Sequence, residues 1–259
     1  MVTSKGHLNP GDREVHFERF DPGLDPLVRH VWIVRWDVPA GQRRPQRVLT
    51  YPAGNIVIGP EGAALYGPDS RVQVRELTGR SWAVGILLRA AGMRALIATP
   101  PDSLVGAAEP LPSSPHADIV AAISAVDMSD RITSILRRWL GPLAEQVDDS
   151  GHLANEACQI AEEDTHLLRV ADLADRLGVG ERRLRRVVHD HVGVTPKWLI
   201  ECRRLQTAAT TLFTSPATDL AALAADLGYA DQAHFTRTYR SVLGETPDRT
   251  RAAGMAARR

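Results

Sequence analysis

The sequence predicts an α+β protein of two domains, a small β-barrel domain with trailing helices followed by an all-α domain. Short β-branched and aromatic runs bounded by Pro, Gly or Asp continue to about residue 89, whereas later apolar residues recur at helical spacing. An internal repeat with a period of about fifty residues then marks the second domain. We expect residues 1–146 to form the first domain, residues 147–151 the linker and residues 152–259 the second domain.

Composition is that of an ordinary globular protein and not of a membrane protein. The chain has 259 residues, of which 44% are hydrophobic and 24% charged. No apolar run approaches the roughly 20 residues of a membrane-spanning helix, and the N-terminus lacks the apolar core of a signal peptide. We therefore expect a soluble cytoplasmic protein with no membrane partner.

Charge is divided unequally along the chain, although the formal net charge is zero. Residues 166–259 contain 15 Lys and Arg against 10 Asp and Glu, a net charge of +5, and residues 1–165 contain 16 against 21, a net charge of −5. Because salt screens exposed charges beyond about 10 Å, phosphates respond to local charge. The C-terminal part is therefore the candidate for binding nucleic acid.

Seven short segments of the N-terminal part have the composition of β-strands. Such strands, separated by turn residues, favour a small barrel or sandwich, and barrels of this size can hold one small ligand. The segments are residues 15–20, 28–38, 47–51, 55–58, 63–66, 71–77 and 82–88.

Aromatic residues in or beside these strands are candidates for an apolar ligand pocket. Trp32 and Trp36 share one strand face because side chains alternate with period 2, and we expect Trp82 to point with them. The alternative is that these rings fill the core of the barrel. The candidate ligand-binding residues are Trp32, Trp36, Tyr51, Tyr66 and Trp82.

Helical spacing follows in residues 93–98, 119–126 and 132–143, with a loop or strand-like connection at residues 100–115, which contain five prolines. The apolar stripe of residues 132–143 is either domain core or the seam of a dimer. Residues 153–161 are the expected leading helix of the second domain.

The repeat consists of two copies of one structural motif. Residues 173–178 (LADRLG) recur as residues 223–228 (LAADLG), and residues 193–196 (GVTP) recur as residues 244–247 (GETP). Leu-Ala-x-x-Leu followed by Gly predicts a short helix that ends in a tight turn, and a second apolar stripe follows each turn. Two helices joined in this way form a helix-turn-helix, whose second helix normally enters the major groove of DNA.

The exposed faces of the two second helices carry the candidate DNA contacts. In the first copy, Leu184 points inward and arginines gather on the opposite face, where their planar guanidinium groups match guanine or phosphate. The second copy is less cationic, and Gln232 can read adenine. The candidate DNA-binding residues are Arg182, Arg183, Arg185, Arg186, His189, Lys197, Gln232, His234, Thr236, Arg237 and Arg240.

One long helix is expected between the two copies. Thr195 and Pro196 form a strong helix start, and residues 196–213 continue one apolar stripe. Its 18 residues span about 27 Å at 1.5 Å per residue, which can separate the reading helices by nearly one turn of DNA.

The C-terminal part resembles the DNA-binding domain of AraC/XylS-type transcriptional regulators. The resemblance covers residues 150–252 and rests on the doubled motif, residues 228–237 (GYADQAHFTR) and the closing Gly-x-Thr-Pro. It implies that both recognition helices enter successive major grooves. The N-terminal part is similar, more weakly, to the cupin-like sensing domain of such regulators, with residues 51–55 (YPAGN) as its turn into a strand.

Two residues depart from the family pattern. Gly180 stands where a Ser or Thr cap is usual, which predicts a slightly looser start of the first reading helix. Thr250 stands where an aromatic residue is common, which predicts thinner packing of the last turn.

The expected function is that of a sequence-specific transcriptional regulator, with double-stranded operator or promoter DNA as partner. RNA polymerase, a small-molecule effector and a second copy of the chain are further partners considered. The alternatives are an N-terminal domain for dimerisation or partner binding without a ligand, a cupin-like enzyme with a helical appendage, and a helical adaptor that binds protein. We expect no enzyme, cofactor or metal, because the sequence has no nucleophile motif, phosphate-binding loop or His-x-His pair.

Overall fold

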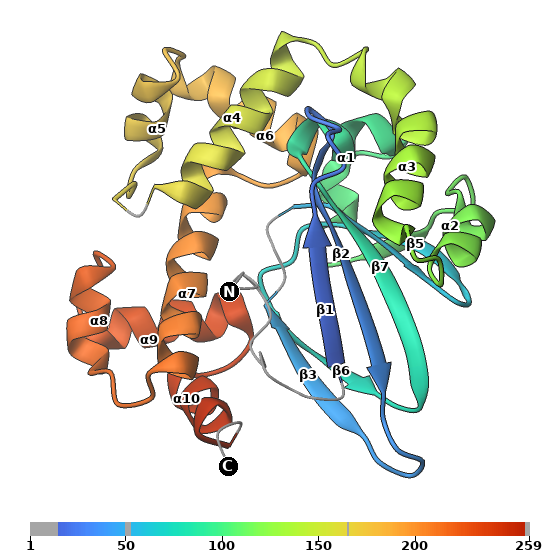
Figure 1. The fold of residues 1–259 in the computed structure, drawn as a ribbon. Coiled ribbons are helices and arrows are strands. Elements are labelled where there is room, and N and C mark those ends of the chain that lie inside the picture. Colours follow the sequence, from blue (N-terminus) through green and yellow to red (C-terminus); the bar gives the residue numbers. More distant parts are fainter. Residues whose placement is uncertain (1–14, 50–52, 165, 257–259) are drawn as a thin grey trace.

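The computed structural model describes residues 15–49, 53–164 and 166–256. It contains an N-terminal domain built on β-strands and a C-terminal helical domain, which lie side by side (Figure 1). The α+β architecture expected from the sequence is confirmed. Within the described part of the chain, no helix is long and apolar enough to cross a membrane.

The N-terminal strands form a six-stranded antiparallel sheet in the order β1-β2-β7-β4-β5-β8 and a separate two-stranded ribbon of β3 and β6. Because sheet and ribbon share no ladder in the described residues, hydrogen bonds do not close them into a complete barrel. The strands are β1 (Val15–Phe20), β2 (Val28–Asp37), β3 (Arg44–Leu49), β4 (Asn55–Gly59), β5 (Gly62–Tyr66), β6 (Val72–Leu77), β7 (Arg80–Leu88) and β8 (Ala108–Pro110).

All seven expected strands are present, with shifted ends. β3 begins at Arg44, earlier than expected, and includes Pro45, which a strand at the edge of a sheet tolerates. The added strand β8 lies within the proline-containing connection and pairs with β5. This connection is therefore partly strand and partly the 3₁₀ helix η1 (Pro101–Leu104).

Three helices and one face of the sheet enclose the N-terminal core: α1 (Ala90–Leu96), α2 (His116–Ala122) and α3 (Met128–Ala144). Ile33 and Ile86 of the sheet are fully buried with Ile132 and Leu136 of α3. Each such side chain contributes about 1.5–3 kcal/mol on burial. The buried residues of the apolar stripe of α3 are therefore domain core, and Trp139 and Leu143 of the same stripe are partly buried against it.

The C-terminal domain is helical throughout, and α7 forms its axis (Figure 1). One pair of helices, α5 and α6, lies toward the start of α7, and another pair, α8 and α9, lies toward its end. The helices are α4 (Asp149–Glu163), α5 (Val170–Arg176), α6 (Glu181–Val192), α7 (Pro196–Thr214), α8 (Leu220–Asp226), α9 (Gln232–Leu243) and α10 (Pro247–Ala256).

The segment expected as the linker, residues 147–151, is mostly helical. The carboxylate of Asp148 accepts a hydrogen bond from the Gly151 amide at 2.8 Å, so α4 begins at Asp149. An N-cap of this kind satisfies an amide that the first helical turn leaves free. The connection between α3 and α4 is therefore short, from Glu145 to Asp148.

Candidate nucleic-acid interface

The first unit (α5 and α6) and the second unit (α8 and α9) have the same turn between their helices. In the first unit, the amide of Val179 donates to the carbonyl of Ala174 at 3.1 Å, and in the second, Tyr229 donates to Ala224 at 2.9 Å. The glycine before each amide has a φ of 63° or 73°, a left-handed conformation that favours glycine. The repeat in the sequence is thus a repeat of backbone geometry.

The outer face of α6 is strongly cationic. Leu184 and Val188 are fully buried in the core of the first unit, which turns the polar residues outward. Arg185 forms an ion pair with Glu181 one turn earlier, and His189 Nδ1 lies 3.6 Å from Asp190 Oδ1. All five candidate side chains of this helix are exposed: Arg182, Arg183, Arg185, Arg186 and His189.

The outer face of α9 carries fewer charges. Phe235 and Tyr239 are fully buried beneath it. Gln232, His234, Arg237 and Arg240 are exposed, Thr236 is half-buried, and Lys197 at the start of α7 is exposed. The ring of His234 meets the edge of Tyr229 at 5.5 Å between centroids. The structure therefore leaves every candidate DNA-binding residue at least partly accessible, and their contacts with DNA stay a prediction.

The helices α6 and α9 start differently. Gly180 precedes α6 and offers no side-chain cap, whereas the carboxylate of Asp231 accepts a hydrogen bond from the His234 amide at 2.6 Å at the start of α9. The helix α6 thus lacks the side-chain cap that α9 has, and the looser start expected for α6 stays a prediction.

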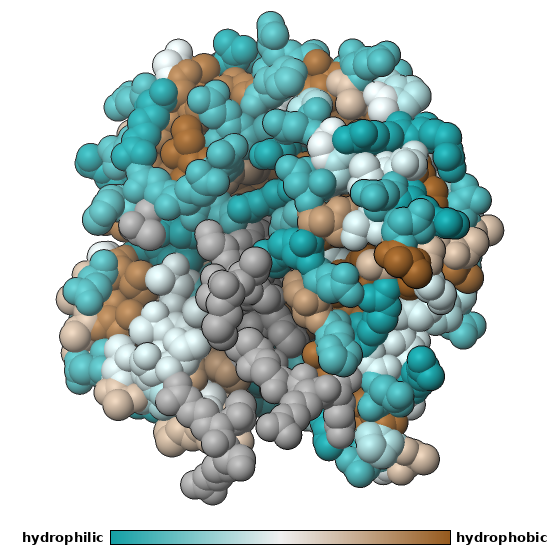
Figure 2. All heavy atoms as spheres, in the orientation of Figure 1, coloured by the Kyte–Doolittle hydropathy of each residue, from teal (hydrophilic) through white to brown (hydrophobic). Residues whose placement is uncertain are grey.

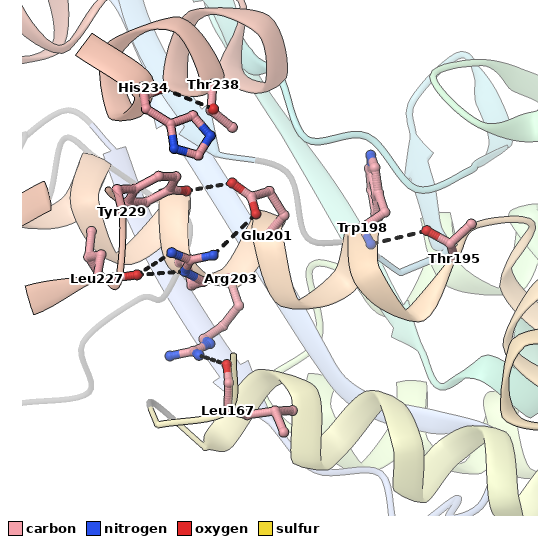
Figure 3. Close-up of polar contacts among 10 residues, drawn as sticks. Leu167, Thr195, Trp198, Glu201, Arg203, Leu227, Tyr229, His234 and Thr238 are labelled. Carbon is pink, nitrogen blue, oxygen red and sulfur yellow. Dashed lines mark hydrogen bonds and ion pairs between the residues drawn. The ribbon is translucent and has the colours of Figure 1, made fainter. Parts of the chain in front are cut away.

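Polar side chains on α7 hold the turn of the second unit (Figure 3). Arg204 donates from Nε to the Leu227 carbonyl at 2.7 Å, and its guanidinium carbon lies 4.2 Å from the centre of the Tyr229 ring. Tyr229 OH donates to Glu201 Oε1 at 2.5 Å. Burial and this bond to the Glu201 carboxylate raise the pKa of Tyr229 well above its usual value. The network positions α9 through its preceding turn.

Arg203, the neighbouring arginine, points toward the first unit. Its Nη2 donates to the carbonyl of Leu167, just before α5, at 3.1 Å (Figure 3). Adjacent side chains of α7 therefore connect it to both units. Glu201, Arg203 and Arg204 are not among the residues predicted from the sequence, although they hold the two units on α7. Their position in the sequence could have indicated this role. Two arginines next to Leu205 on the buried stripe of the long helix need polar partners, because burying an unpaired charge is costly.

The N-terminal domain contacts the first unit by close packing. The backbone of Pro101 and Asp102 in η1 lies so near Gly193, the residue that ends α6, that a Cβ there would approach it within 2.4 Å. Asn155 of α4 also accepts from the Ala91 amide at 2.9 Å and donates to the Pro26 carbonyl at 2.8 Å. These contacts seat α4 and α6 against the sheet domain.

The contact of the N-terminal domain with the second unit combines polar bonds with the packing of Val72 of β6 against the core of that unit. Arg47 of β3 forms an ion pair with Glu245, in the turn after α9, and both side chains are nearly buried. Ser70 donates to the carbonyl of Val242 near the end of α9 at 2.8 Å. The N-terminal domain therefore contacts both reading units at the ends of their recognition helices.

Thr250 does not thin the packing of the last turn as expected. It is fully buried, donates to the Glu245 carboxylate at 2.5 Å and meets the hydroxyl of Tyr239 at 2.7 Å. A chain of hydrogen bonds replaces the packing that an aromatic ring would give. The expectation was wrong because it considered only the smaller side-chain volume of threonine. The Thr250 hydroxyl also joins two buried polar groups by hydrogen bonds.

The aromatic residues expected at a ligand pocket lie on two faces of the sheet. Trp32 stacks on Phe17 and lies against Gly85, on the face opposite the helices, and alternation places Trp36 and Tyr66 on that face too. Trp82 packs against the core on the other face, because it shares a side of β7 with Val84. The expectation that Trp82 points with Trp32 and Trp36 was therefore wrong. Tyr51 lies outside the described residues.

Groups suited to metal or thiol chemistry are not gathered into a site. In the described ranges, no group of three or more His, Cys, Asp or Glu side chains could hold a metal ion. Cys158 and Cys202 are both free, and burial raises the pKa of Cys158 to about 12. A thiol with so high a pKa is a poor nucleophile at neutral pH.

Hydrophilic side chains cover much of the face drawn in Figure 2. This agrees with the burial of the main apolar side chains in three clusters, one in the N-terminal domain, one around the first unit and one around the second.

Two family models match the chain. A helix-turn-helix domain matches residues 173–253, and a domain of unknown function (DUF6597) matches residues 20–110. No curated protein matches. The first match runs from within α5 to within α10 and so includes most of the first unit, the helix α7 and the second unit.

Several solved structures are similar to the chain. A transcriptional regulator with an AraC-type DNA-binding domain from Chromobacterium violaceum is 28% identical over 40% of this chain and 94% of its own, with a TM-score of 0.37. The C-terminal domain of AraT, a response regulator from Geobacillus stearothermophilus, is 21% identical over 40% and 88%, with a TM-score of 0.36. ToxT from Vibrio cholerae O395 is 12% identical over 93% and 98%, with a TM-score of 0.43.

Proposed function

We propose that this chain is a DNA-binding transcriptional regulator whose C-terminal domain belongs to the AraC-type helix-turn-helix family. It recognises its operator with both α6 and α9. Its affinity for the operator changes when a small molecule binds the N-terminal domain. The proposed activity is binding and not catalysis. We expect the protein to act in the cytoplasm, where its DNA partner is located.

The observation that carries the DNA-binding part is the exposed arginine face of α6. Arg182, Arg183 and Arg186 form no ion pair in the described part of the chain, so their guanidinium groups are available for guanine edges or phosphates. Arg185 can exchange its pairing with Glu181 for a phosphate or base, since exposed ion pairs of this type are weak.

The helix α7 supports simultaneous reading by both units. Its 19 residues span about 28 Å at 1.5 Å per residue, close to the roughly 34 Å of one DNA turn. Arg203 and Arg204 fix it to the first and second units, respectively. The proposed footprint is therefore asymmetric and covers two successive major grooves, because the two reading faces differ.

Control by the N-terminal domain is supported by its contacts with both units. A ligand that favours one position of this domain over another changes the freedom of α6 and α9 at their C-terminal ends. For this, the ligand must bind with different affinity to two arrangements of the chain, one in which the N-terminal domain contacts both units and one in which it does not.

Selection of bound sequences from random duplex DNA by the full chain tests the DNA-binding part. We expect an enriched motif with two unlike elements about 10 base pairs apart, and affinity that falls steeply with salt. Enrichment of a single short element would contradict reading by both units. Absence of any salt-sensitive DNA binding by folded protein would contradict the function itself.

A further inference from the structure

The helix α7 passes from the core of the first unit to the core of the second within a few residues. Ile200 is the last residue of α7 in the first apolar cluster, and Leu205 is the first in the second. Each unit is thus held by its own part of α7. The orientation of one unit relative to the other therefore depends on the contacts made around residues 201–204, which belong to neither cluster.

Two neighbouring arginines of this stretch each hold a backbone segment of one unit. Arg203 Nη2 donates to the carbonyl of Leu167, just before α5, at 3.1 Å (Figure 3). Arg204 Nε donates to the carbonyl of Leu227, just after α8, at 2.7 Å. Both arginine side chains are buried. The two segments are therefore brought to the same part of α7.

The next residue of each segment makes a direct contact between the units. A Cβ placed on Gly228 would lie 3.1 Å from Leu168 Cδ1 and 3.5 Å from Arg204 Nη2, so the Leu168 side chain packs on the backbone of the turn before α9. Leu168 is 46% exposed and lies in none of the three apolar clusters. Its contact therefore joins the two units without forming part of either core.

We propose that Leu168 determines the spacing at which the two units recognise DNA, as the contact point of an interunit joint formed by Leu168, Arg203, Arg204 and Gly228. This inference rests on the proposed recognition by both units and identifies what sets the spacing of the operator. Inserting one base pair between two DNA elements moves the second by about 3.4 Å along the axis and about one tenth of a turn around it. A firm joint penalises this displacement, whereas a loosened joint allows the second unit to follow it.

Fluorescence anisotropy with the full chain and three duplexes tests the proposal. The duplexes are the selected operator and two versions with one base pair inserted or removed between its elements. We expect the altered spacing to weaken wild-type binding about tenfold, an effect similar to that of one mismatched base pair. Leu168→Ala should bind the selected operator nearly as well as the wild type does, and altered spacing should weaken its binding by only about threefold.

Two control variants separate the joint from a general loss of stability. Leu168→Met keeps a long apolar side chain and should restore the wild-type penalty for altered spacing. Met255→Ala removes a similarly exposed apolar side chain, 47% exposed, from α10 and should leave the penalty unchanged. Because Arg47 also holds the second unit through Glu245, the series is repeated in an Arg47→Met background, where Leu168→Ala should reduce the penalty further.

Two results with these duplexes overturn the proposal. One is an unchanged penalty for altered spacing in Leu168→Ala in both backgrounds. The other is equal weakening of Leu168→Ala on all three duplexes, which would assign the side chain to stability or to direct DNA contact.

Distances between spin labels in the full chain test the joint without DNA. Asp190→Cys on α6 and Ser241→Cys on α9 provide exposed labelling positions near the ends of the two recognition helices. Cys158→Ala removes the partly buried native thiol, and Cys202 is buried. We expect Leu168→Ala to widen the distribution of distances between the labels and Leu168→Met to leave it unchanged. Identical distributions with leucine and alanine at this position overturn the joint.

The two measurements distinguish failure of this inference from failure of the proposed function. DNA binding with an unchanged spacing penalty refutes the role of Leu168 and leaves the proposed function standing. Absence of DNA binding by folded wild-type protein refutes the proposed function, and the label distances still decide whether Leu168 holds the two units together.

Discussion

The two helix-turn-helix units share a turn but differ in how their cores are filled and how their reading helices begin. Leu184, Val187 and Val188 give the first unit an aliphatic core, whereas the rings of Tyr229, Phe235 and Tyr239 meet edge to face in the second. The first reading helix starts at uncapped Gly180 and the second at Asp231, which caps it. One backbone plan is therefore stabilised by two different sets of interactions.

The units also differ in their attachment to the N-terminal domain. Gly193 of the first unit packs against the η1 backbone, a contact that depends on shape and is insensitive to salt. Glu245 of the second unit pairs with Arg47, a contact that depends on charge. The attachment of the second unit therefore includes a charge-dependent contact beside the packing of Val72, whereas the contact at Gly193 of the first unit is made by backbone packing.

The largest expected effect comes from the aromatic core. Phe235 is fully buried between Tyr229 and Tyr239, so Phe235→Ala should lower the free energy of unfolding by about 3–5 kcal/mol. Leu184→Ala in the first unit should cost about 2–5 kcal/mol. Urea denaturation followed by circular dichroism measures both. Met255→Ala, on an exposed position of α10, is the control and should change little. Near-wild-type stability of Phe235→Ala would mean that the ring cluster does not stabilise the second unit.

The next effect concerns the reading faces. Arg182→Ala, Arg185→Ala or Arg186→Ala should weaken operator binding by about 1–3 kcal/mol where the side chain contacts a base. Arg240→Ala and Lys197→Ala should mainly reduce the salt dependence, because we expect phosphate contacts there. Competition between operator and random duplex DNA separates these outcomes. Equal losses on both DNAs for all five variants would show that the first unit attracts DNA without reading it.

The attachment of the second unit gives a smaller effect on stability. Arg47→Met leaves the nearly buried Glu245 carboxylate with Thr250 but without its closest cation, which should cost about 1–2 kcal/mol. Arg43→Met, at the residue just before β3, removes an exposed ion pair with Glu76 and is the matched control. Thermal unfolding measures stability, and hydrogen exchange of α9 measures docking. If both variants behave alike, the contact between β3 and Glu245 does not hold the second unit.

Local patterns predicted most of the elements because their causes are local. The strand at residues 15–20 and the helix that starts at Pro196 follow from side-chain alternation, an N-cap and the backbone preferences of proline. The repeat likewise predicted both turns, since each needs glycine at a left-handed position. The exposed arginines of α6 followed from the apolar stripe on its other face.

Contacts between distant residues could not be predicted in this way. The pairing of β3 with β6 in a ribbon separate from the main sheet depends on long-range register. The same holds for the side chains of Trp82 and Trp32, which lie on opposite faces of the sheet. Arg47 and Glu245 are almost 200 residues apart, and neither lies in a motif that names the other.

The smallest expected effect returns to the starts of the reading helices. Asp231→Ala removes the cap of α9 and should cost about 1 kcal/mol. Gly180→Ser should instead stabilise α6 by a few tenths of a kcal/mol, because Gly180 already has the extended conformation of a cap and a Cβ there meets no atom within 4 Å. Serine adds no charge beside the arginine face, so any gain in DNA affinity would come from helix order. Differential thermal unfolding of the two variants measures the effect. A loss of stability in Gly180→Ser would show that the first unit needs glycine there for a reason other than capping.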